Sequence, residues 1–268
     1  MTKIADLSET ASYSVRCPEC KVEEADLKAN SETENLTVEV RAVASKFGAS
    51  LVGIVPSKDI DSFAKIWVGW EIQEYTKKTI DIMPNAKSVV VMAYHVWDDM
   101  LELAIHKGEE WVYPGYLPLD VLIVSVKNFL EQKGYKAAYA RSISHKRLAQ
   151  LAGLGNYGKN SLIINPEFGP WLRFAAIVTN AALTASTPFS LDLCEDCEEC
   201  IKACPAGALT PYRVDDRKCL LGVHLSNKTS FERNPKWRNI EPPLTKNSHV
   251  MCMKCQKACR YGRERHQA

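Results

Sequence analysis

The chain has 268 residues, 46% of them hydrophobic and 25% charged, a composition that excludes disorder over most of its length. Its net charge of +2 argues against a protein that binds nucleic acid by bulk charge alone. No apolar run approaches the roughly 20 residues that cross a bilayer, and the first residues lack the features of a secretory signal. We therefore expect a cytoplasmic protein with no membrane partner.

Residues 1–34 are polar and show no sustained apolar period, so we expect a loosely ordered N-terminal arm. Cys17 and Cys20 lie in this arm as a CxxC pair. No second pair and no His lies nearby to complete a tetrahedral metal site. We therefore expect that Cys17 and Cys20 are not essential to the protein's chemical function.

Residues 35–188 are predicted to form a three-layer α/β (α+β) domain, because helical and strand patterns alternate along them. Leu36, Val40 and Phe47 recur at helical spacing. Short apolar runs over 49–55 and 88–94 predict buried strands. Further helices are expected over 119–134 and 145–151, and further strands over 135–140 and 173–178.

The composition changes near residue 188, and the segment 189–268 contains eight of the ten cysteines. Cys194, Cys197, Cys200 and Cys204 form the C-x2-C-x2-C-x3-C-P run of bacterial ferredoxins. In that run, three thiolates bind one [4Fe–4S] cluster and the fourth binds the other cluster. A ferredoxin-like domain with two clusters therefore needs a second set of four cysteines.

The second set is Cys219, Cys252, Cys255 and Cys259, whose last two members repeat the spacing of Cys200 and Cys204. Pseudo-symmetry assigns one [4Fe–4S] cluster to Cys194, Cys197, Cys200 and Cys259, and the other to Cys204, Cys219, Cys252 and Cys255. Arg260 replaces the usual Pro after the last ligand. Two structural zinc sites are the alternative, but zinc does not require the crossed fourth ligand.

A glycine-rich segment over 153–160 is the second motif of interest. Its glycines indicate either turns or a backbone that approaches a phosphate or a flat cofactor. Basic residues from Lys133 to Arg173 have few acidic neighbours in the sequence, which suits an anionic ligand or RNA as well as a solvated surface. Trp67, Trp70, Trp97 and Trp111 either belong to the core or line a cofactor.

The glycine-rich segment, Phe168-Gly169-Pro170-Trp171 and the two-cluster pattern together resemble epoxyqueuosine reductases over about residues 36–260, and more distantly the cobalamin-dependent reductive dehalogenases. The resemblance implies a corrinoid-binding domain of the nitroreductase-like type, whose bound cobalamin receives electrons from the two clusters. It also implies which residues line the corrinoid: Gly153, Leu154, Gly155, Asn156, Gly158, Lys159 and Asn160.

The resemblance further implies a proton donor in the strand before the glycine-rich segment. Epoxyqueuosine reductases place an Asp there, whereas residues 132–166 of this chain contain no Asp or Glu. Tyr139 occupies that place, and Arg141 would lie on the same face of a strand, as a Tyr and a cation do in the dehalogenases. A half-buried core role is the alternative for Tyr139.

Three functions agree with these patterns. The first is a cobalamin-dependent reductase that acts on epoxyqueuosine in tRNA or on another electrophile; the chain ends at Ala268, where tRNA-modifying relatives usually carry helical repeats. The second is a reductive activator of a separate corrinoid protein, and the third is an electron-transfer protein without corrinoid. Each requires a low-potential electron donor such as ferredoxin or flavodoxin.

Overall fold

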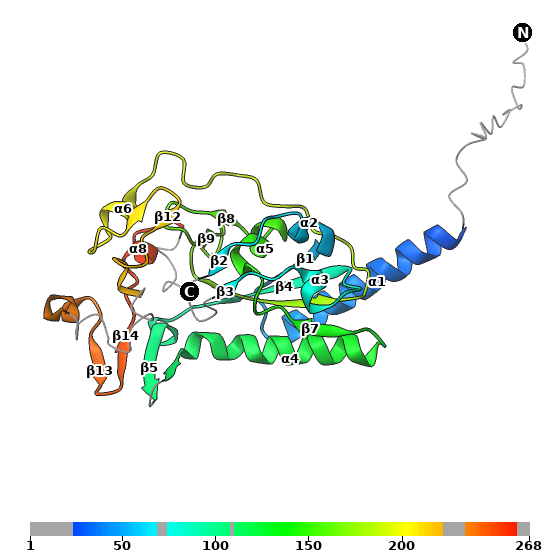
Figure 1. Cartoon of the computed structure of the whole chain (residues 1–268), viewed down its shortest axis with the longest axis horizontal. Coiled ribbons are helices and arrows are strands. Elements are labelled where there is room, and N and C mark those ends of the chain that lie inside the picture. Colours follow the sequence, from blue (N-terminus) through cyan, green and yellow to red (C-terminus); the bar gives the residue numbers. More distant parts are fainter. Residues whose placement is uncertain (1–23, 69–73, 108–109, 222–233, 262–268) are drawn as a thin grey trace, which may run out of the picture.

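The computed structural model describes residues 24–68, 74–107, 110–221 and 234–261 (Figure 1). The predictions for Cys17, Cys20 and Trp70 therefore lie outside the described residues. In the described part of the chain, each helix is either too short or too polar to span a membrane.

A four-stranded sheet forms the centre of the molecule, in the order β1-β4-β10-β7 with every neighbouring pair antiparallel. The four strands are β1 (Leu51–Pro56), β4 (Ser88–His95), β10 (Leu172–Thr179) and β7 (Ala137–Tyr139). Strands were expected at all four places, over residues 49–55, 88–94, 135–140 and 173–178. Successive residues of β4 face opposite sides of the sheet, so that Val89 and Val91 enter one core and Val90 and Met92 enter the other.

Helices cover both faces of this sheet, which confirms the predicted three layers (Figure 1). On one face lie α1 (Glu24–Lys46) and α4 (Leu117–Gln132). On the other lie α5 (His145–Leu151), α2 (Ser57–Asp61) and α3 (Thr79–Ile82). Helix α1 begins at Glu24, so the expectation of a loosely ordered arm up to residue 34 is wrong for its last part. Residues 24–34 favour a helix by composition although they show no apolar period.

A second sheet joins distant parts of the chain, in the order β13-β14-β5-β6. Its strands are β5 (Leu103–Lys107), β6 (Glu110–Val112), β13 (Pro243–Thr245) and β14 (Ser248–Val250). The pairing of Val250 with Leu103 and of Ser248 with Ile105 brings the cysteine-rich segment back onto the α/β part. The cysteines that follow β14 are therefore fixed against that part.

The remaining elements are short. Two single-turn helices precede or contain cysteines, α6 (Glu199–Lys202) and α8 (Lys254–Lys257). Three hairpins are formed by β2 (Trp67–Val68) with β3 (Glu74–Tyr75), β8 (Asn156–Tyr157) with β9 (Ile163–Ile164), and β11 (Leu209–Thr210) with β12 (Arg213–Val214). The 3-10 helices are η1 (Asp99–Glu102), η2 (Pro114–Tyr116) and η4 (Pro235–Asn239).

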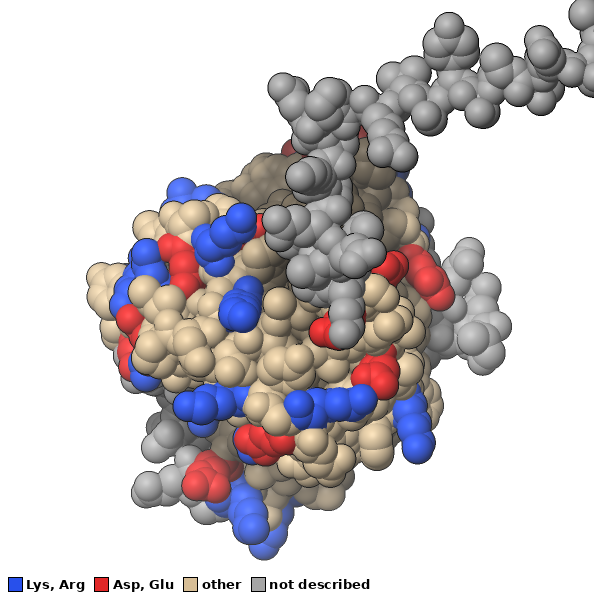
Figure 2. Space-filling model, turned by 90° about the vertical axis from the view of Figure 1, so that its right-hand side faces the viewer, with Lys and Arg blue, Asp and Glu red and all other residues tan. Residues whose placement is uncertain are grey.

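The surface agrees with the balanced composition. On the face turned to the viewer in Figure 2, basic and acidic side chains are interspersed. Trp67 and Trp97 are each 57% exposed, so they are not core residues, whereas Trp171 is 1% exposed and belongs to the interior. Trp111 packs against a small cluster that contains Tyr113 and Met251.

Candidate iron–sulfur and cofactor site

The first predicted set of cysteines borders one cavity. Its lining includes Cys194, Cys197, Cys200 and Cys259, with Lys159 and Asn160 from the glycine-rich segment. Arg260 holds the two chain segments together, because its guanidinium donates a hydrogen bond to the Leu193 carbonyl at 2.7 Å and pairs with the Glu195 carboxylate at 3.2 Å. The fold thus brings the last cysteine to the first three.

The second set is also gathered in space. Burial raises the pKa of the Cys252 thiol to about 11, and negative charge on Cys219 and Cys204 contributes to the rise. Burial likewise raises the pKa of Cys255 to about 12, with further contributions from Cys252, Cys219 and Cys204. Thiols with such pKa values stay protonated at neutral pH unless a metal displaces the proton.

The two sets lie close to each other, because α6, which contains Cys200, packs against α8, which contains Cys255. Among the described residues, no three His, Cys, Asp or Glu side chains are grouped so as to hold a single metal ion. A [4Fe–4S] cluster needs no such group, since each of its four thiolates binds a different iron atom.

The glycine-rich segment contacts the first set directly. The backbone N–H of Lys159 donates a hydrogen bond to Sγ of Cys194 at 3.4 Å. A matching bond joins the N–H of Ala208 to Sγ of Cys204 at 3.3 Å. Lys159 and Asn160 are 9% and 5% exposed. Hydrogen bonds to the sulfur ligands are one of the means by which a protein sets the potential of a cluster.

The glycines of this segment allow it to pack closely against other parts of the protein. A Cβ on Gly155, whose φ is +151°, would lie 2.4 Å from the backbone oxygen of Ile164. A Cβ on Gly153 would lie 2.5 Å from the backbone oxygen of Thr187, and one on Gly158 would lie 2.5 Å from the Ile164 side chain. Neighbouring protein atoms therefore occupy the space that a side chain would need at each of these glycines.

Two other residues of this segment also have structural partners. The Leu154 side chain belongs to the core on one face of the central sheet. The Asn156 side chain accepts a hydrogen bond from Gln150 at 2.7 Å and donates one to the Leu191 carbonyl at 2.9 Å. Lys159 and Asn160, by contrast, line the cavity that the first set of cysteines borders.

The predicted arrangement of Tyr139 and Arg141 is wrong in one respect. Strand β7 ends at Tyr139, so Arg141 lies in the following turn and strand alternation does not place the two side chains on one face. Tyr139 is 41% exposed, and its ring centroid lies 6.2 Å from that of His145. Burial lowers the pKa of His145, so the neighbour of Tyr139 is a neutral imidazole at pH 7.

A buried ion pair near this site escaped the sequence analysis. The Arg173 guanidinium pairs with the Glu102 carboxylate, and the two side chains are 16% and 1% exposed. The Lys133 ammonium similarly pairs with Glu39 at 2.8 Å. The expectation that this basic region lacks compensating acids is thus wrong for Lys133 and Arg173, because the acids come from distant parts of the sequence.

Lys146 was noted only as part of the basic region, and it lies beside the second set of cysteines. Its ammonium donates to the Ser161 carbonyl at 2.7 Å. Although water reaches this side chain, desolvation by the surrounding protein lowers its pKa, and the charge of Arg173 lowers it further. Negative charge on Cys219 and Cys255 acts in the opposite direction.

Two buried polar atoms at the site have no hydrogen-bond partner within the described residues. They are Oγ of Ser161, which follows the glycine-rich segment, and Nε2 of Gln256, which lies between Cys255 and Cys259. Ser161 also adopts φ = +61°, a left-handed conformation that is unusual for a residue other than glycine. Buried polar atoms normally have partners, so both fit a site that holds a bound group.

Comparison with known proteins agrees with these features. The family model for a 4Fe-4S binding domain (Fer4) matches residues 187–210. Epoxyqueuosine reductase from Synechococcus sp. (strain RCC307) is 34% identical over 208 residues, which are 74% of this chain and 62% of the relative. That from Listeria monocytogenes is 35% identical over 121 residues, which are 45% of this chain and 30% of the relative. The chain thus spans less than two thirds of either relative.

The fold is similar to that of solved epoxyqueuosine reductases. The structure from Bacillus subtilis has a TM-score of 0.65 at 20% identity and covers 86% of this chain and 66% of the other. A catabolic reductive dehalogenase has a TM-score of 0.61 at 18% identity and covers 88% of this chain and 34% of the other. The predicted resemblance to the epoxyqueuosine reductase-like family is therefore confirmed.

Proposed function

We propose that the chain is an iron–sulfur oxidoreductase that passes electrons through two [4Fe–4S] clusters to a bound cobalamin, for the reduction of an electrophilic substrate. The observation that carries the proposal is the contact between the glycine-rich segment and the first set of cysteines. Through the Lys159 N–H and Sγ of Cys194, the α/β part and the electron-carrying part share one site.

The crossed assignment of the cysteines is part of the proposal. Cys194, Cys197, Cys200 and Cys259 would hold the first cluster, since they line one cavity. Cys204, Cys219, Cys252 and Cys255 would hold the second cluster, since their charges act on one another. The proximity of Cys200 to Cys255 would then place the two clusters next to each other, as an electron relay requires.

Cobalamin would bind where the α/β part, of the nitroreductase-like type in this proposal, meets the clusters. When bound, it supplies a strongly reducing cobalt centre. The chain's own residues would hold it: Ser161 and Gln256 offer unpartnered buried polar atoms, and Lys146 offers a cation to an anionic group. Among the residues implied by the resemblance, Lys159 and Asn160 line the cavity beside the first set of cysteines and remain the best candidates.

Tyr139 remains the proposed proton donor, with Arg141 in the adjoining turn. A reduced carbon centre must be protonated, and a positioned acid contributes roughly a hundredfold or more to the rate. The phenol of Tyr139 is 41% exposed and is therefore accessible to a substrate.

We propose tRNA as the substrate class, because one solved relative is a complex of epoxyqueuosine reductase with an epoxyqueuosine-modified tRNA stem loop.

A surface around the β2–β3 hairpin carries aromatic and basic side chains of the kind that bind RNA. Trp67 and Tyr75, which are 57% and 61% exposed, form an edge-to-face pair 5.5 Å apart. A neighbouring cavity is lined by Lys77, Lys78 and Arg147. Exposed aromatic rings stack on unpaired bases, and cations bind phosphates.

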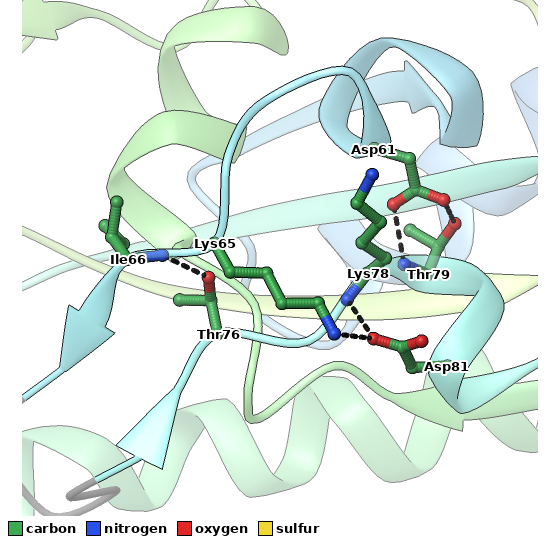
Figure 3. A network of polar contacts seen from close by, with 7 residues as sticks. All are labelled: Asp61, Lys65, Ile66, Thr76, Lys78, Thr79 and Asp81. Carbon is green, nitrogen blue, oxygen red and sulfur yellow. Dashed lines mark hydrogen bonds and ion pairs between the residues drawn. The ribbon is translucent and has the colours of Figure 1, made fainter.

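Figure 3 shows the hydrogen bonds that hold this surface in shape. The Lys65 ammonium and the Lys78 N–H both donate to the Asp81 carboxylate, at 2.7 and 2.9 Å, and together they lower its pKa. Asp61 accepts from the N–H and the hydroxyl of Thr79 at 2.6 Å each. Lys65 is thus engaged with an acid, whereas Lys77 has no ion pair with any described residue.

Corrinoid binding tests the proposal. Protein with reconstituted clusters is mixed with cobalamin without oxygen, passed through gel filtration and examined by visible absorption. We expect wild-type protein to retain about one corrinoid per chain, Ser161→Ala to retain less, and Ser57→Ala, which removes another unpartnered buried hydroxyl, to match wild type. Wild-type protein with intact clusters that retains no corrinoid at tens of micromolar would contradict the proposal and favour a plain electron-transfer protein.

A further inference from the structure

One buried carboxylate contacts a cluster ligand. Glu241, between η4 and β13, is 1% exposed. Its Oε1 accepts a hydrogen bond from the backbone N–H of Cys252 at 3.1 Å. Its own N–H donates to the Trp237 carbonyl at 3.0 Å, which fixes the residue at the end of η4. The carboxylate is therefore held beside the second set of cysteines.

Its burial distinguishes Glu241 from the acids that flank the first set of cysteines. Glu195, which follows the first ligand directly, has a side chain that is 70% exposed and forms an ion pair with Arg260. Water screens the charge of such a residue. A charge in the interior acts more strongly on its neighbours, because the effective dielectric constant there is lower.

We propose that Glu241 is a positioning residue that lowers the reduction potential of the second cluster, so that the reduced cluster becomes a stronger electron donor. The inference rests on the proposed cluster assignment and adds a role for a residue outside it. Reduction brings one electron from the low-potential donor into the cluster, and oxidation passes the same electron on, with no bond formed or broken. A negative charge nearby disfavours the electron-rich state, and net charge is one of the determinants of cluster potential.

The substitution Glu241→Gln removes the negative charge of the side chain and changes little else. Glutamine has nearly the same shape, and its amide oxygen can still accept the hydrogen bond from the Cys252 N–H. Glu195→Gln is the matched control, because it removes a carboxylate close to a ligand of the first cluster but at an exposed position. Cys252→Ala identifies which of the two signals belongs to the second cluster.

The experiment is a redox titration of the full chain with both clusters, followed by electron paramagnetic resonance. At a fixed applied potential, we expect Glu241→Gln to raise the ratio of reduced to oxidised second cluster at least tenfold, which corresponds to about 59 mV for a one-electron couple. The first cluster should shift less, and Glu195→Gln should shift neither cluster measurably.

An unchanged second-cluster potential in Glu241→Gln, or an equal shift of both clusters, would overturn the inference. Iron analysis of the same samples separates this result from a failure of the proposed function. About eight iron atoms per chain with an unshifted potential contradict only the role of Glu241, whereas wild-type protein without a second cluster contradicts the assignment itself.

Discussion

The buried pair of Arg173 and Glu102 provides a quantitative test of the site's electrostatics. Replacement of Arg173 by Met keeps most of the side-chain volume but leaves the Glu102 carboxylate, which is 1% exposed, without its cation. Removing one partner of a buried pair costs about 3–5 kcal/mol, because the remaining charge is neither hydrated nor compensated. For a protein of this size, that loss lowers the unfolding midpoint by roughly 10 °C.

Thermal unfolding followed by circular dichroism without oxygen measures this loss of stability. The matched control is Lys127→Met, which breaks an exposed pair with Glu131 whose side chains are 39% and 43% exposed. Pairs of that kind contribute about 0.3–0.5 kcal/mol. If Arg173→Met lowers the midpoint no more than Lys127→Met does, the Arg173–Glu102 pair does not contribute the stability expected of a buried ion pair.

Three further predictions concern the site. Gly155→Ala should cost about 1–3 kcal/mol more in unfolding free energy than Gly134→Ala, because both glycines have a positive φ that strains another residue, but a Cβ on Gly155 would also meet a backbone oxygen at 2.4 Å; equal midpoints would contradict the packing role. Cys194→Ala and Cys252→Ala should each remove a different paramagnetic signal, and the same residual signal in both would contradict the crossed sets. Tyr139→Phe should lower epoxyqueuosine turnover roughly a hundredfold without changing corrinoid retention, and unchanged turnover would place the proton donor elsewhere.

The sequence was most informative where the determinants are local. The spacing of Cys194 to Cys204 reflects how a tight loop wraps one cluster, so the motif could be interpreted without a structure. Residues 89–93 of β4 are all apolar because helices cover both faces of the sheet, and this pattern also predicted their burial. For the same reason the layers were predictable, although the strand order was not.

Contacts between distant residues could not be predicted from one sequence. Glu102 and Arg173 meet only because η1 and the start of β10 lie side by side in the fold, and Glu241 reaches Cys252 only through the return of β13 and β14 onto β5. A glycine also does not reveal what occupies the space beside it. At Gly155 that space is filled by β9, whereas the sequence was equally compatible with a ligand.

Reduction of bound corrinoid by the clusters is the central claim, and one measurement tests it most directly. Wild-type protein and Cys194→Ala, each loaded with cobalamin, are mixed with reduced flavodoxin without oxygen, and the visible absorbance of the corrinoid is followed with time. We predict rapid reduction in wild type and a rate at least tenfold lower in Cys194→Ala, because that variant lacks the ligand that joins the first cluster to the glycine-rich segment. Equal rates in the two proteins would contradict electron transfer through this cluster.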